Sequence, residues 1–297
     1  MSYPTAAIEN RFDLVRERLL AYYELAKPRV LTMILITALA GFYMGAGADF
    51  EVTAALRMLF GVTLAAGGTL ALNQYMERVT DGIMHRTRNR PVPSERITPA
   101  EALFVGVLAT VLGIAQLWFA VNPLAALVTG TISVLYLGAY TPMKRFTWMC
   151  HVIGAVPGAL PPVIGWAAAR GTLAFEPFVM FGIMFFWQLP HSLSIARLYQ
   201  ADYARAGLSL LPQDREWGNP ASVLMLAATI TLTIFGMLPA WMGFAGKIYL
   251  PISVLLGAVL LGYAFALVRG STTARRVMFV SLIYLPCVLL AMVLDKV

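Results

Sequence analysis

The sequence predicts an all-α, polytopic membrane protein, with about nine transmembrane helices enclosing a central cavity open to the cytoplasmic side. Three observations predict this class. The 297 residues are 59% hydrophobic and only 12% charged, whereas soluble proteins are about 45–50% apolar and about 25% charged. The mean hydropathy is +0.74. The apolar residues also form successive long segments, which excludes a disordered or fibrous chain, and two cysteines cannot make a disulfide framework.

The unbroken series of apolar segments predicts a single membrane-embedded unit over residues 1–297. Residues 1–27 mix acidic and basic side chains and contain no apolar stretch of the secretory type. We expect this part to be a cytoplasmic lead-in that lies on the membrane surface.

A helix that crosses a bilayer needs roughly 20 mostly apolar residues. Two intervals, 74–98 and 194–219, are instead long and polar, and are the expected cytoplasmic active-site loops. Small residues in the second span, Gly61, Ala65 and Gly68, predict close packing against a neighbouring helix. Scanning the chain with this length gives nine spans: 28–47, 53–73, 99–119, 122–140, 151–169, 174–193, 220–239, 247–268 and 276–294.

The basic residues predict the orientation of these spans. If the N-terminus is cytoplasmic, all but four of the 22 lysines and arginines fall in cytoplasmic segments, as the positive-inside rule requires. The net charge of +7 therefore needs no nucleic-acid partner. Nine spans that start on the cytoplasmic side place the C-terminus on the external side. We expect the membrane to be the inner (cell) membrane. The exceptions are Arg57, Arg170, Lys247 and Lys296.

A row of oxygen-bearing side chains follows the second span. Asn73, Glu77 and Asp81 lie at i, i+4 and i+8, so on a helix they drift only about 40° around the axis while rising roughly 12 Å. Mg²⁺ prefers one or two carboxylates completed by water and substrate phosphate. The following arginines, which include Arg86, can contact phosphate oxygens in a bidentate manner. The pattern indicates a Mg²⁺–phosphate site, although a solvated helix extension has the same spacing.

Four stretches carry a resemblance to a known family: 25–45, 71–97, 140–171 and 185–212. They contain the motifs MHRTRNRP, YTPMKR and GAVPGALPPVIGW. Together they resemble the intramembrane prenyltransferases of the UbiA type, and most closely the branch of that superfamily that acts on heme. They cover more than a third of the chain in the expected order.

The resemblance implies a Mg²⁺-dependent farnesyl transferase. Farnesyl diphosphate would give its farnesyl group to a vinyl group of protoheme IX, with addition of water, to form heme O for heme-copper oxidases. Further candidate partners are heme A synthase and oxidase assembly factors. The motifs place Mg²⁺ and the catalytic role on Asn73, Glu77, Asp81 and Asp202, and diphosphate binding on Arg29, Arg86, Lys144 and Arg145.

The sequence departs from the family pattern in its motifs. Glu77 replaces an aspartate but keeps the carboxylate, whereas Gln200 and Ala201 replace a charged pair, so that only Asp202 carries over from the second acidic motif. Ser192 and Leu193 follow His191 where the family has aromatic residues. Protoheme as the acceptor makes His191, and less so His151, a candidate heme contact, although a histidine near a helix end is more often an interfacial hydrogen bonder.

Two other functions remain open at this point. A prenyltransferase with a quinone or chlorophyll-type acceptor would share the diphosphate site, and only the MHRTRNRP and YTPMKR motifs favour heme. A secondary transporter also fits nine spans. Transporters, however, tend to carry ionisable residues or unwound helices at mid-membrane, whereas nearly every acid here lies at a membrane edge or in a loop.

Overall fold

The computed structural model describes residues 5–212 and 220–297, and these form helices joined by short turns. Residues 1–4 of the expected lead-in and 213–219 of the second expected loop lie outside the described residues. No strand occurs in the described ranges. The helices are α1 Thr5–Leu25, α2 Pro28–Ala46, α3 Val52–Ile83, α4 Pro99–Ala120, α5 Pro123–Val134, the π-helix η1 Leu135–Tyr140, α6 Thr141–Met143, α7 Cys150–Ala159, α8 Pro161–Arg170, α9 Glu176–Leu198, α10 Gln200–Arg205, α11 Pro220–Trp241, α12 Tyr249–Val268 and α13 Ala274–Leu294.

Within these described residues, nine helical segments are long and apolar enough to cross a membrane. Continuous segments made of α5, η1 and α6, and of α7 and α8, form the fourth and fifth. The predicted all-α membrane fold and the predicted spans are thereby confirmed, and the chain is a multi-pass membrane protein.

Several spans end a few residues from the expected position, as α9 does at Leu198 rather than at 193, and two larger differences have local causes. The second span continues as α3 to Ile83, well into the expected loop 74–98, because Gln, Met, Glu and Arg after Asn73 are good helix formers. The fifth span breaks at Leu160, between α7 and α8. Pro161 has no N–H to donate, which suits it to the first position of α8, whereas Pro157 is accommodated inside α7.

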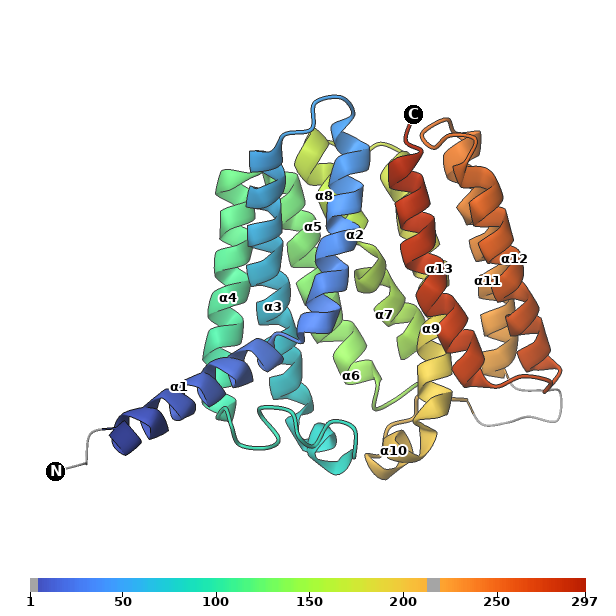
Figure 1. Ribbon diagram of the computed structural model, residues 1–297. Helices are drawn as coiled ribbons and strands as arrows, with labels where there is room; N and C mark the ends of the chain where they lie inside the picture. Colours follow the sequence, from blue (N-terminus) through green and yellow to red (C-terminus); the bar gives the residue numbers. More distant parts are fainter. Residues whose placement is uncertain (1–4, 213–219) are drawn as a thin grey trace.

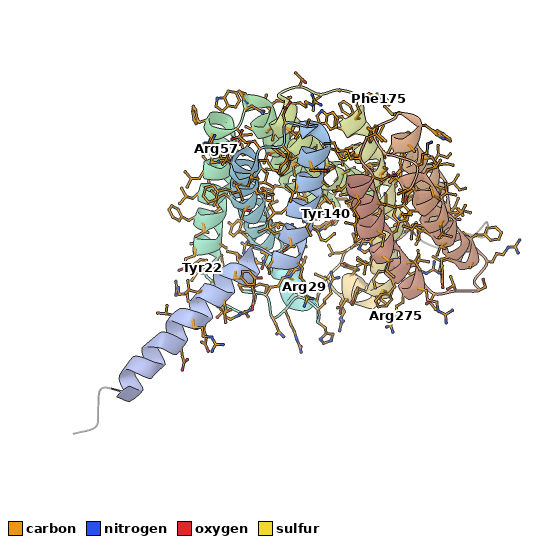
Figure 2. All side chains as sticks on the ribbon, turned by 45° about the horizontal axis from the view of Figure 1, so that its top comes forward. Tyr22, Arg29, Arg57, Tyr140, Phe175 and Arg275 are labelled. Atoms are coloured by element: carbon orange, nitrogen blue, oxygen red, sulfur yellow. The ribbon has the colours of Figure 1, made fainter. Side chains whose placement is uncertain are left out.

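The bundle has two distinct ends (Figure 1). One end, here called the loop end, carries segment 84–98, α10 and the junction of α1 with α2, and α1 runs away from the bundle there. The other end carries the C-terminus. Figure 2 shows Arg29 and Arg275 at the loop end, Arg57 and Phe175 at the opposite end, and Tyr140 inside the bundle.

Two apolar clusters form the two halves of the core. One is built mainly from α9, α11, α12 and α13, and the other from α2, α3, α4, α5 and α8. The halves meet along α2, which contacts α8 on one side and α13 on the other. A cavity between the halves, described below, is therefore bounded by helices from both.

Small residues bring the helix backbones close together. A Cβ atom built on Gly165 would lie 1.8 Å from the carbonyl oxygen of Ala38, and one on Gly41 would lie 2.0 Å from that of Pro162. The same holds between α3 and α4, where a Cβ on Gly68 would lie 2.5 Å from the Thr110 nitrogen. Close backbone approach at small residues is a main source of helix association in membranes, so the predicted packing of the second span is confirmed.

We predict that Gly165→Ala destabilises the bundle, since the added methyl group meets α2 backbone atoms that cannot move aside. Overpacking of this kind typically costs about 1–3 kcal/mol. Gly262→Ala in α12 is the matched control, because nothing lies within 4 Å of a Cβ built there, and alanine favours helix over glycine by about 0.5–1 kcal/mol. Thermal unfolding in detergent should rank Gly165→Ala below the wild type and Gly262→Ala at or above it. Equal effects of the two variants would contradict the assigned α2–α8 contact.

Candidate active site

The predicted row of oxygen atoms lies on one face of α3, at the loop end. Asn73 is fully buried, Asp81 is 1% exposed and the side chain of Glu77 is 14% exposed. The helix therefore carries an amide and two carboxylates out of contact with bulk water. Burying such groups is unfavourable unless they are hydrogen-bonded or paired with opposite charge.

Each of these three side chains meets a cation from a different segment. Lys27 Nζ donates to Asn73 Oδ1 at 2.5 Å, and Lys144 Nζ to Glu77 Oε1 at 2.7 Å. Asp81 Oδ2 accepts from Arg90 Nη1 at 2.6 Å. The cations come from the α1–α2 junction, from the turn after α6 and from segment 84–98. The row of oxygens thus gathers three distant parts of the chain, and we call these six residues the ion-pair row.

Lys27 was not among the residues predicted from the sequence. The structure places it in the ion-pair row, next to Asn73. Its backbone is left-handed, with φ of 49°, and Pro28 starts α2 directly after it. Gln74, next to Asn73, donates to the carbonyls of Glu24 and Leu25 and so holds the end of α1 against α3. A lysine followed by proline at the start of the first span was the only available signal.

Burial changes the electrostatics of the lysines. Desolvation, followed by repulsion from Arg90, lowers the pKa of Lys27 to about 7. Burial also opposes the charge of Lys144, but attraction to Tyr140, over whose ring it lies, and to Glu77 outweighs it and raises the Lys144 pKa above its usual range. Lys144 is therefore a permanent cation in this site, whereas Lys27 loses its proton easily.

The π-helix η1 fixes the orientation of Asn73. Asn73 Nδ2 donates to Thr141 Oγ1 at 3.0 Å, and Thr141 donates to the carbonyl of Tyr136 in η1. With its nitrogen occupied in this way, Asn73 presents its oxygen to the ion-pair row. Single π-helical turns are frequent at functional sites, and no sequence pattern predicted this one.

Asp81 keeps one oxygen atom free for a ligand. Its Oδ1 is buried and has no hydrogen-bond partner, although a buried carboxylate oxygen normally has one. Within the described residues, no three His, Cys, Asp or Glu side chains converge closely enough to bind a metal by themselves. A Mg²⁺ ion held by few protein oxygens and completed by water and phosphate fits both observations.

Asp202 and Arg86 lie in a second cluster, apart from the ion-pair row. The Asp202 carboxylate accepts from the backbone N–H groups of His85 and Arg86 at 3.4 and 3.3 Å and pairs with Arg205. The Arg86 guanidinium lies over the ring of Tyr199 and donates to the Tyr203 hydroxyl at 2.8 Å. Here these two residues join segment 84–98 to α10, which closes one side of the loop end.

Hydrogen bonding also determines the charge of Asp202. Desolvation raises its pKa, but the backbone hydrogen bonds from Arg86 and His85 outweigh that effect and hold the pKa below its usual range. The carboxylate is thus ionised at neutral pH and suited to a cation.

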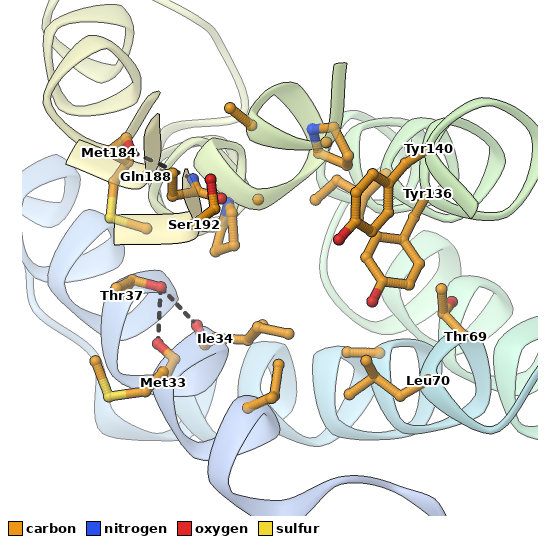
Figure 3. Close-up of a pocket in the computed structure, with 18 of the residues that line it drawn as sticks. Met33, Ile34, Thr37, Thr69, Leu70, Tyr136, Tyr140, Met184, Gln188 and Ser192 are labelled. Carbon is orange, nitrogen blue, oxygen red and sulfur yellow. Dashed lines mark hydrogen bonds between the residues drawn. The ribbon is translucent and has the colours of Figure 1, made fainter. Parts of the chain in front are cut away.

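A cavity of about 540 Å³ lies inside the bundle, and Tyr140, over whose ring Lys144 lies, is part of its lining. This is the size of typical small-molecule pockets, which are about 300–1,000 Å³ and mostly apolar. Figure 3 shows Tyr136 and Tyr140 on one side, Thr69 and Leu70 of α3 on a second, and α2 and α9 on the others. Arg29 lies at the loop end of this lining. A second cavity of about 380 Å³ is lined by Glu77, Lys144 and Arg145.

The two candidate histidines both line the larger cavity but are held differently. His151 Nε2 bonds to the carbonyl of Leu210 at 3.0 Å. His191 Nδ1 bonds to the Ser281 hydroxyl at 2.9 Å, and its ring stacks on Trp187.

Solved structures with the same fold include a digeranylgeranylglyceryl phosphate synthase and a UbiA homolog from Archaeoglobus fulgidus bound to GPP and Mg²⁺. The first has a TM-score of 0.80 at 17% sequence identity and covers 94% of this chain and 98% of its own. The second has a TM-score of 0.61 at 14% identity and covers 92% of this chain and 99% of its own. At such identities the likeness concerns the fold.

Sequence relatives are closer. Residues 34–285 match the UbiA prenyltransferase family. The chain is 41% identical over 287 residues to the protoheme IX farnesyltransferase of Solibacter usitatus, and the match covers 93% of this chain and 98% of that protein. The resemblance noted from the motifs is thereby confirmed, and the chain belongs to the UbiA prenyltransferase family, in the branch that contains the protoheme IX farnesyltransferases.

Proposed function

We propose that this prenyltransferase moves the farnesyl group of farnesyl diphosphate onto a vinyl group of protoheme IX, with addition of water, to give heme O. One observation carries the proposal: Lys144 of the ion-pair row lies over the ring of Tyr140, and Tyr140 lines the larger, mostly apolar cavity. A donor with a charged head and a fifteen-carbon tail needs a charged site next to an apolar cavity. The kinship with protoheme IX farnesyltransferases supports protoheme as the acceptor.

Mg²⁺ is the proposed cofactor. Asn73, Glu77 and Asp81 would hold it, and the unpartnered Asp81 Oδ1 supports an ion there. We also assign Asp202 to metal binding, through the family motif and its ionised carboxylate. Bound Mg²⁺ supplies positive charge that neutralises the departing diphosphate.

The chain's own cations provide the remaining stabilisation of the leaving group. Lys144 stays charged, and Arg29 and Arg145 are exposed at the loop end, so all three are proposed to bind diphosphate oxygens. We assign Arg86 to the same group, from the side of segment 84–98. Positive charge that is already in place where negative charge develops is the largest single contribution to the rate enhancement of many enzymes.

The cavity provides the second half of the chemistry. When the C–O bond to diphosphate breaks, an allylic cation remains, and the apolar lining keeps bulk water from it. The rings of Tyr136 and Tyr140 present π-electron faces that stabilise a cation. The vinyl group then attacks C1 of the farnesyl cation, water adds to the resulting cation at the former vinyl group, and a proton leaves.

We also propose in which membrane the protein lies and how it is oriented there. Residues 1–297 form a single unit in the inner membrane, with the N-terminus and the loop end in the cytoplasm, where farnesyl diphosphate is soluble. Heme O would pass to heme A synthase or other oxidase assembly factors.

The direct test supplies purified protein in nanodiscs with Mg²⁺ and farnesyl diphosphate, with and without protoheme. We expect heme-dependent diphosphate release and a heme product that carries one farnesyl group and one water. Release that responds to a quinone-type ring but not to heme would overturn the assigned acceptor.

We predict that Asp81→Asn, or chelation of divalent metal, abolishes turnover while the protein remains inserted, because the fold rests on apolar spans. Asp49→Asn, an exposed acid at the opposite end, is the matched control. Farnesyl transfer should be measured over a Mg²⁺ titration. Turnover near the wild-type level in Asp81→Asn would remove the metal assignment.

Lys144→Met should weaken the use of farnesyl diphosphate with little change in heme affinity. Loss of one charge-assisted contact typically costs about 1.5–3 kcal/mol, or roughly 10- to 150-fold in binding or rate. Lys247→Met, at the opposite end, should behave like the wild type. Steady-state kinetics with each substrate varied in turn separates the effects, and an equal loss for both substrates would contradict a diphosphate-specific role.

A reporter fused after Val297 should report the external side of the membrane, because nine spans that begin inside end outside. Alkaline phosphatase, active only outside, and a fluorescent protein active only inside give opposite readings. A cytoplasmic reading would reverse the proposed orientation or change the span count.

A further inference from the structure

The chain has three histidines, and their hydrogen bonds assign them different tasks. His85 is exposed on segment 84–98, away from the cavity lining. His151 Nε2 faces the carbonyl of Leu210, and because a carbonyl only accepts, this nitrogen carries the proton. His151 thus ties α7 to the segment after α10, which is a structural task.

The tautomer of His191 follows from the hydrogen bonds of the Ser281 hydroxyl, which has a single proton to donate. The Ser281 hydroxyl donates its one proton to the carbonyl of Met278 at 2.7 Å. Toward His191, 2.9 Å away, the same hydroxyl can then only accept. His191 Nδ1 must carry the proton, and Nε2 is left with a lone pair.

The ring of His191 is also fixed in direction. It stacks on Trp187, one turn earlier on α9, with centroids 4.9 Å apart and planes 15° apart. Trp187 Nε1 donates to the backbone carbonyl of Ser281 at 2.7 Å. Trp187 and His191 of α9 are therefore both anchored on Ser281 of α13. Partners that fix the tautomer and plane of a histidine in this way are the usual support of metal-ligating imidazoles.

The free nitrogen is open to the cavity. His191 lines the cavity, and its Nε2 has no hydrogen-bond partner and is not among the enclosed polar atoms of the described residues. Leu282, Leu285 and Pro286 of α13 also line the cavity and carry no hydrogen-bonding side chain, whereas Gln188 and Ser192 are the polar residues of α9 in the same lining. A neutral imidazole with an oriented lone pair in an apolar site is a common axial ligand of heme iron.

We propose that His191 Nε2 binds the iron of the acceptor porphyrin, with Ser281 as the positioning residue. The inference rests on the proposed function and sharpens it, since an iron ligand selects heme over iron-free rings. Iron ligation would also place the acceptor in the cavity that Tyr140 and Arg29 line at the loop end, so that both substrates share one chamber.

The test measures ligation rather than turnover. Protein purified with a histidine-free tag is titrated with ferric protoheme IX in nanodiscs without farnesyl diphosphate, and absorption and electron paramagnetic resonance spectra are recorded. We expect a histidine-ligated spectrum that His191→Gly abolishes and added imidazole restores. Ser281→Ala should keep the ligation but weaken heme binding about 10- to 100-fold, and His85→Gln should leave the spectrum unchanged.

Iron-free protoporphyrin IX provides a second measurement. The wild type should bind heme more tightly than this ring, and His191→Gly should lose that preference while still binding farnesyl diphosphate, which shows that it is folded. A wild-type spectrum in His191→Gly, or loss of ligation in His85→Gln alone, would overturn the inference. If the wild type farnesylates heme but His191→Gly keeps the spectrum, only the ligand assignment fails. If the wild type neither binds nor farnesylates heme, the proposed function fails with it.

Discussion

Carboxylates removed from water must be met by positive charge, and this requirement organises the loop end of the bundle. Glu77 and Asp81 stand on a helix that continues from the membrane, so water reaches them poorly. Lys144 and Arg90 meet them, and each is brought from a different segment of the chain. Breaking such a pair by removing one partner leaves a buried charge and is strongly unfavourable. The ion pairs therefore join segment 84–98 and the turn after α6 to α3.

The same pairs prepare the site for its ligands. A diphosphate brings negative charge and a divalent metal brings positive charge, so together they offer new partners to both members of every pair. The cations can turn to phosphate oxygens while the α3 oxygens turn to the metal, and little charge is left unmatched during the exchange. A site that held only acids, or only lysines, would instead repel itself when empty.

The sequence predicted the features that depend on helical periodicity, but not those that depend on contacts between distant segments of the chain. Asn73, Glu77 and Asp81 share a face because helical spacing requires it, and the nine spans follow from length and apolar content. The role of Lys27 depends on a left-handed turn that Gln74 stabilises from another helix, and no local pattern shows this. Asp202 was expected to bind the same metal as the acids of α3, and that remains a prediction. Its carboxylate accepts from two backbone N–H groups of segment 84–98, which no local sequence pattern shows.

The two histidines show how much a single hydrogen bond decides. In the sequence both stand near helix ends, and both are candidates for a heme contact, His151 less so than His191. His151 Nε2 donates to the carbonyl of Leu210 and links α7 to the segment after α10, whereas the partner of His191 Nδ1 is a hydroxyl already committed as a donor to Met278. Each contact determines which ring nitrogen keeps the lone pair, Nδ1 in His151 and Nε2 in His191. The difference lies in α13, some 90 residues from His191, which is why only the folded chain reveals it.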